Sequence, residues 1–107
     1  MTDDACSFSC SVDGDEAVLR AVGELDVFAA PTFESIAADL LAGAPRRMRL
    51  DLRDVRFIDS TGVRALVLLA ERARRADIGL ALDASAVVAR LLELTGLQRV
   101  FAPGPDD

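Results

Sequence analysis

The chain has 107 residues, 51% of them hydrophobic, and its 12 basic residues against 18 acidic ones leave a formal net charge of −6. This length and composition suit one domain with a single core, and the negative charge supplies no field that would gather a phosphate backbone, so we expect no direct binding to nucleic acid. Every basic residue is arginine and histidine is absent, which excludes imidazole bases, Schiff-base lysines and the lysine of a phosphate-binding loop.

The first two expected elements are strands joined by a turn. Residues 7–12 alternate between serines and apolar side chains, as a half-buried strand does. Residues 13–15 read Asp-Gly-Asp, a turn sequence, and residues 17–22 form a second apolar strand, so we expect a hairpin. Cys6 and Cys10 lie four residues apart, about 13 Å along such a strand, and cannot bridge each other within it.

The cysteines and the apolar runs also bear on where the protein resides. With no secretory leader and no second cysteine pair, two reduced thiols in the cytoplasm are the ordinary interpretation. The longest apolar stretches fall short of the ~18 residues that a membrane span needs. We therefore expect a cytoplasmic protein without a membrane partner.

A helix and a strand follow the hairpin. Pro31 suits the first turn of a helix, apolar residues then recur at helical spacing, and Gly43 and Pro45 stop the helix. Residues 47–53 alternate between apolar and charged side chains, and 55–58 continue this strand.

The second half of the chain predicts a helix over residues 61–75, a short strand over 79–83 and a last helix capped by Ser85. Thr95-Gly96 ends that last helix, with Leu97 placed for a Schellman contact. The core stripe of the 61–75 helix is expected to consist of Val63, Leu66, Val67, Ala70 and Ala73. A final strand is expected around 99–102, and residues 103–107 have the composition of a short acidic disordered tail.

This order of elements defines the fold class. Right-handed crossovers between successive strands give an α/β domain, over residues 1–102, with a mixed and mostly parallel sheet of four or five strands. Strands buried on both faces would be continuously apolar, whereas these alternate. We therefore expect the helices mainly on one face.

Asp59-Ser60-Thr61-Gly62 stands where the third strand meets the second helix. The simplest interpretation is a helix cap, in which Asp59 or Ser60 accepts from free amide groups. The functional interpretation is that Ser60 is phosphorylated, since its hydroxyl would project from an exposed turn. A phosphate adds roughly −1.5 to −2 charge at pH 7, and Asp59, with Asp26 from the preceding strand end, would sharpen its repulsion of a partner.

Four segments of the chain together resemble the STAS-domain anti-sigma factor antagonists of bacteria. The segments are Gly23-Glu24-Leu25-Asp26, Leu50-Asp51-Leu52, Phe57-Ile58-Asp59-Ser60-Thr61-Gly62-Val63 and Leu91-Leu92-Glu93-Leu94-Thr95-Gly96-Leu97. The chain departs from the family pattern at Asp77-Ile78-Gly79, where two adjacent glycines are common, and at Val63, where leucine is more usual. Neither departure removes the serine.

The resemblance implies a non-enzymatic, phosphorylation-controlled regulator of transcription that functions by partner switching in processes such as the stress response. Ser60 would be the phosphoacceptor, Asp59 would flank it, and Thr61 and Gly62 would shape the helix start. The surface that binds the partner would include Asp26, Asp59, Thr61 and Gly62. The unphosphorylated protein would bind an anti-sigma factor that is itself a serine kinase, and the phosphorylated protein would release it. A serine phosphatase would reverse the modification, and no cofactor or metal is implied.

A second hypothesis concerns the outer face of the 61–75 helix. Arg64, Ala65, Leu68, Arg72 and Arg75 lie away from the expected core stripe, with Leu68 exposed among arginines. They form a candidate partner-facing patch, although a single exposed leucine on a solvated face is also ordinary.

Three alternatives to the switch differ in how well the sequence supports them. A STAS domain that does not switch, as a scaffold or as the cytoplasmic subunit of a lipid transporter, would share the fold and stays open. An enzyme with Ser60 as nucleophile lacks the usual base. A response-regulator receiver, suggested by Asp51 and Asp54, lacks that family's lysine.

Overall fold

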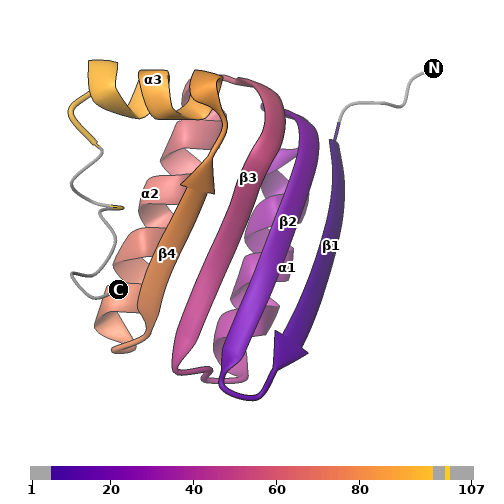
Figure 1. Cartoon of the computed structure of the whole chain (residues 1–107), viewed down its shortest axis with the longest axis vertical. Coiled ribbons are helices and arrows are strands. Elements are labelled where there is room, and N and C mark those ends of the chain that lie inside the picture. Colours follow the sequence, from indigo (N-terminus) through magenta and orange to yellow (C-terminus); the bar gives the residue numbers. More distant parts are fainter. Residues whose placement is uncertain (1–5, 98–100, 102–107) are drawn as a thin grey trace.

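Four strands form one sheet in the order β1-β2-β3-β4 (Figure 1), as shown by a computed structural model that describes residues 6–97 and residue 101. The elements are β1 (Cys6–Asp13), β2 (Glu16–Leu25), α1 (Ala30–Ala42), β3 (Arg47–Ile58), α2 (Ser60–Arg75), β4 (Gly79–Ala84) and α3 (Ala86–Leu94). β1 pairs antiparallel with β2, whereas the β2–β3 and β3–β4 pairs are parallel. The expected mixed, mostly parallel sheet is confirmed.

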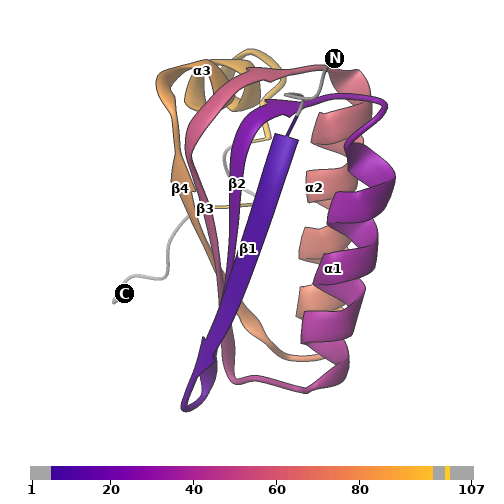
Figure 2. The same ribbon diagram turned by 90° about the vertical axis from the view of Figure 1, so that its right-hand side faces the viewer.

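The helices lie where the alternating strands predicted. Figure 2 shows α1 and α2 side by side on one face of the sheet, and α3 lies at the end where β3 and β4 finish. The expected fifth strand and the 103–107 tail fall outside the described residues, apart from Phe101, which is buried. None of the helices described is long and apolar enough to cross a membrane.

β3 keeps one apolar side over twelve residues only because its pairing with β2 shifts twice. The register moves from Arg20↔Asp51 to Val22↔Asp54, and again after Gly23↔Val55. Each shift places one extra residue on β3, and each extra residue reverses which face the following side chains occupy. The buried core side chains of β3 therefore follow a spacing of two, two, three and three: Met48, Leu50, Leu52, Val55 and Ile58.

The buried side of α2 is displaced from its expected stripe. Leu66, Ala70 and Ala73 are buried as expected and Leu69 joins them, whereas Val63 and Val67 are only half-buried. Ala65 is 1% exposed, so its placement on the outer face was wrong. The sequence pattern predicted that α2 packs only against the sheet. In the structure α2 also packs against α1, which buries the residues between the two helices.

Both ends of α3 match the sequence expectation. The Ser85 hydroxyl accepts from the Val88 amide at 3.3 Å and so caps the helix start. Gly96 has φ 73°, and the Leu97 amide donates to the Leu92 carbonyl at 2.8 Å. This is the Schellman ending that Thr95-Gly96-Leu97 predicted.

The face of the sheet opposite α1 and α2 carries a network of ion pairs centred on Asp51, which is 8% exposed. Arg53 donates through Nε to Oδ1 and through Nη2 to Oδ2, both at 3.0 Å, and Arg20 Nη1 donates to Oδ2 at 3.3 Å. The hydrogen bonds from Arg53 are the main cause that lowers the pKa of Asp51 from 3.8 to about 2. The charged form of Asp51 is therefore stabilised by folding.

The lowered pKa of Asp51 predicts a loss of stability in acid. The contribution is fully present above pH ~4 and is lost as the pH falls toward 2, and it amounts to on the order of 2 kcal/mol. We expect Asp51→Asn to reduce the free energy of unfolding at pH 7 and to flatten its decline between pH 4 and pH 2, measured by urea unfolding. Asp54→Asn, which removes an exposed carboxylate bonded to Arg20, is the control. Parallel pH profiles for wild type and Asp51→Asn would contradict the assignment.

Candidate functional site

The junction between β3 and α2 presents Ser60 at the first position of the helix. Asp59 is the N-cap residue, in an extended conformation, and its Oδ1 accepts from the Gly62 amide at 3.0 Å. Asp59 rather than Ser60 therefore supplies the cap that the sequence predicted. Among the residues that the structure describes, no side-chain hydrogen bond engages the Ser60 hydroxyl, and the residue is exposed. The Ser60 hydroxyl is therefore accessible to a modifying enzyme.

Asp59 also ties this junction to the loop between β2 and α1. Its second oxygen, Oδ2, accepts from the Val27 amide at 3.2 Å. The loop is braced separately by Asp26, whose Oδ1 accepts from the Phe28 and Ala29 amides at 3.1 Å each. Two carboxylates expected at the site from sequence are thus brought to either side of Val27. Both accept from backbone amides, but only the bond between Asp59 and Val27 joins the two loops.

Gly62 allows the first turn of α2 to lie against the end of β2. It is buried, and a Cβ at this position would stand 2.3 Å from the Leu25 carbonyl oxygen and 2.8 Å from Ile58 Cγ1. Only glycine permits that approach. Gly62 therefore lets α2 begin against β2, and because it is buried it leaves little surface of its own for a partner. Its role in binding a partner stays a prediction.

Two apolar side chains beside the junction were missed from sequence. Val27 is 51% exposed and Phe28 is 83% exposed, on the loop that Asp59 and Asp26 brace. The available signal was their position: they follow the last buried residue of β2 and precede Pro31, so they belong to neither periodic pattern. A nearly bare phenylalanine on a braced loop is the kind of side chain that anchors protein interfaces.

The outer face of α2 carries the other side chains that the sequence placed on a partner-facing patch. Arg64 and Arg72 are exposed, Leu68 is 40% exposed, and Thr61 is half-buried. A small hollow of about 190 Å³ opens between α1 and α2, and its walls are Phe33, Glu34, Ala37, Ala65, Leu68, Leu69 and Arg72. The expected exposure of Leu68 is confirmed, and its role in binding a partner stays a prediction.

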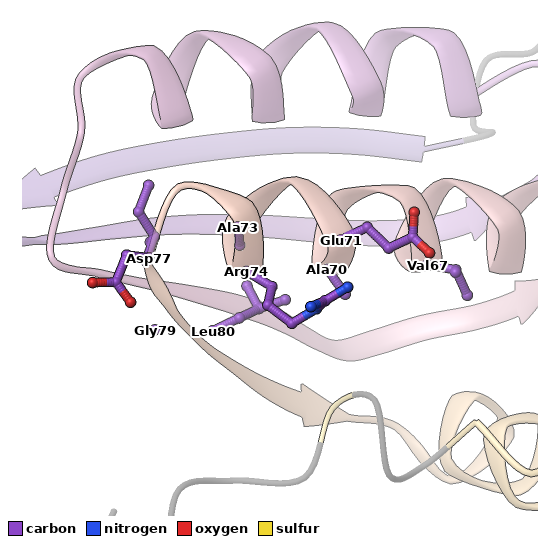
Figure 3. Close-up of a pocket in the computed structure, with 9 residues that line it drawn as sticks. Val67, Ala70, Glu71, Ala73, Arg74, Asp77, Gly79 and Leu80 are labelled. Atoms are coloured by element: carbon purple, nitrogen blue, oxygen red, sulfur yellow. The ribbon is translucent and has the colours of Figure 1, made fainter.

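A larger hollow, of about 530 Å³, lies along the second half of α2 (Figure 3). Its charged groups are Glu71, Arg74 and Asp77, all exposed. The first residue of α2 that lines it, Val67, lies about two helical turns after Ser60. Within residues 6–97 and 101, no three acidic or cysteine side chains gather as a metal site would require.

These features define a class: a small α/β domain with an exposed serine at the start of α2, between two loops tied by one aspartate. The STAS domain family model matches residues 9–106, and the chain belongs to this family. It is 32% identical over 93 residues to a STAS-domain containing protein of Pseudomonas aeruginosa, a match that covers 85% of this chain and 90% of that protein.

Two solved proteins show the same architecture. An anti-sigma factor antagonist from Mycobacterium paratuberculosis superposes with a TM-score of 0.86 at 26% identity, covering 97% of this chain and 89% of that one. The Bacillus anti-sigma factor antagonist SpoIIAA superposes in its unphosphorylated form with a TM-score of 0.75 at 22% identity, over 92% and 88% of the chains. Its phosphorylated form gives 0.72 at 20% identity, over 92% and 91%. At these identities, the similarity to SpoIIAA is one of fold.

Proposed function

We propose that this protein is an anti-sigma factor antagonist whose binding to its partner is switched by phosphorylation of Ser60. The observation that carries the proposal is the state of the two junction side chains. Asp59 is committed through both oxygens to backbone amides, while Ser60 beside it is exposed with a free hydroxyl. The similarity to proteins named as anti-sigma factor antagonists supports the partner class, and SpoIIAA is a protein with a phosphorylated form.

The partner is an anti-sigma factor with serine kinase activity. It would contact the surface around Ser60 that comprises Val27, Phe28, Arg64, Leu68 and Arg72, and would transfer the γ-phosphoryl group of ATP to Ser60 Oγ, with ADP leaving. The bound kinase is withheld from its sigma factor, so transcription proceeds. A cytoplasmic serine phosphatase would restore the unmodified serine.

The phosphate affects the fold and the interface in opposite directions. At the start of α2 the helix dipole favours a negative charge by about 0.3–1 kcal/mol, so the domain tolerates the modification. At an interface, an unpaired buried charge costs on the order of 2–5 kcal/mol. The larger cost falls on binding, and the carboxylates of Asp59 and Asp26 add repulsion.

Phosphosite mapping by mass spectrometry tests the proposal. The protein is purified from its native cells during growth, starvation and stress, with Ser60→Ala expressed alongside. We expect a single phosphate on Ser60 that is absent from Ser60→Ala, and fragment ions must separate Ser60 from the half-buried Thr61. A phosphate on Thr61 in place of Ser60 would contradict Ser60 as the acceptor. No phosphate in any condition would contradict the switch and favour a STAS scaffold or transporter subunit.

A further inference from the structure

β1 is an edge strand that lacks, over residues 6–12, the features that usually protect an edge. It has eight residues and pairs with β2 without a register shift. Its one charged residue is Asp13, at its last position beside the turn, and residues 6–12 contain no charged residue and no proline. Edge strands present unpaired backbone groups, and proteins ordinarily guard them with charges, prolines, bulges or short length. The opposite edge, β4, has six residues and carries Asp83, which bonds to Arg49.

Only the first half of β1 is covered by α1. Cys6 and Phe8 pack against the core, and the Phe8 ring lies 6.2 Å from that of Phe33 on α1. Cys10 is exposed and Val12 is 66% exposed, although both lie on the same side of the strand as Phe8. Figure 2 shows β1 diverging from α1 toward the hairpin. The apolar side of β1 therefore has a covered half and a bare half.

The sequence of β1 is complementary to itself in the antiparallel direction. Around Ser9, the segment Cys-Ser-Phe-Ser-Cys-Ser-Val places serine opposite serine and apolar opposite apolar side chains when it meets a second copy. Such a two-fold pairing also sets the bare Cys10 and Val12 of one copy beside the covered Phe8 and Cys6 of the other. We propose that β1 is a homodimer interface, in which two copies pair edge to edge and extend the sheet to eight strands.

The geometry also sets the strength of this association. A single strand pair buries a small area, so the dimer belongs to the weak and transient class of interfaces. Each copy carries a net charge of −6, so the copies repel one another at low salt. Added salt should therefore shift the equilibrium toward the dimer. The interface does not depend on Ser60 and is independent of the proposed switch.

Sedimentation equilibrium over a wide range of protein concentrations tests the interface. We expect a monomer–dimer equilibrium in the wild type, and Ser9→Lys should raise the dissociation constant by about tenfold or more, because two like charges would face each other. Ala89→Lys, with the same charge change on an exposed residue of α3, should leave it unchanged. A wild type that stays monomeric, or equal dimerisation in Ser9→Lys, would overturn the proposal.

Cross-linking with a short bismaleimide checks the geometry without relying on the lysine variant. Cys10 lies next to the centre of the proposed pair, whereas the two copies of Cys6 would stand about 20 Å apart along the strands. Cys6→Ser, which keeps Cys10, should cross-link to a covalent dimer. Cys10→Ser should not. A covalent dimer formed through Cys6, or none through Cys10, would exclude this pairing.

Discussion

Gly62→Ala is expected to lower the free energy of unfolding by about 2–4 kcal/mol, despite alanine's better helix propensity. That propensity favours alanine by about 1 kcal/mol. The added Cβ, however, would stand 2.3 Å from the Leu25 carbonyl oxygen, and a backbone atom in a sheet cannot rotate away. The clash dominates, and the thermal midpoint should fall by about 10–20 °C, measured by circular dichroism.

Gly79→Ala is the matched control for this prediction. A Cβ at Gly79 would meet its nearest atoms, Arg47 Cγ and the Arg46 carbonyl oxygen, at 3.6 and 3.7 Å, which is ordinary contact. Its midpoint should stay close to that of the wild type. Equal stability of Gly62→Ala and Gly79→Ala would show that α2 can begin farther from β2, and the junction around Ser60 would then not be fixed by this glycine.

Phosphorylation of Ser60 is expected to weaken binding to the kinase by roughly thirtyfold to a few thousandfold, which corresponds to the 2–5 kcal/mol cost of an unpaired charge at an interface. The affected kinase is the one that modifies Ser60 in native cells. Calorimetric titrations with the nucleotide held constant should show the loss for the phosphoprotein and, in part, for Ser60→Asp. Ser60→Ala should bind nearly as well as the wild type, because it adds no charge.

Ala42→Asp separates a local effect from one of net charge. Ala42 is exposed at the far end of α1, where the chain is distant from Ser60 (Figure 1). The Ala42→Asp substitution adds the same negative charge as Ser60→Asp and should leave the affinity for the kinase unchanged. Equal losses in both variants would indicate long-range repulsion by an already acidic chain. If the phosphoprotein bound the kinase as tightly as the unmodified protein, the switch would be contradicted, even if Ser60 were phosphorylated in cells.

The helices and strands were predictable because each depends on local patterning and punctuation. Pro31, Gly43 and Ser85 mark helix ends in both sequence and structure. The side chains that face the core were harder to predict. Strict alternation in β3 fails after Leu52 because two extra residues enter its pairing with β2, and those shifts depend on the partner strand.

The same limit applies to the candidate site. Ser60 and its capping neighbour were identified from one continuous segment of sequence. The bond from Val27 to Asp59 joins residues 32 positions apart, and only the folded chain shows it. Phe28 was passed over for the same reason, since its importance comes from the loop being held beside Ser60. Whether these residues contact a partner stays a prediction.

The double engagement of Asp59 has a consequence for how fast a switch at Ser60 could operate. Since both carboxylate oxygens already hold backbone amides, the junction has no spare acceptor that must be released or rearranged when a phosphate arrives. The modified and unmodified forms should then share one backbone conformation, and no slow structural relaxation would separate them. The response time of the regulatory circuit would be set by the enzymes that add and remove the phosphate.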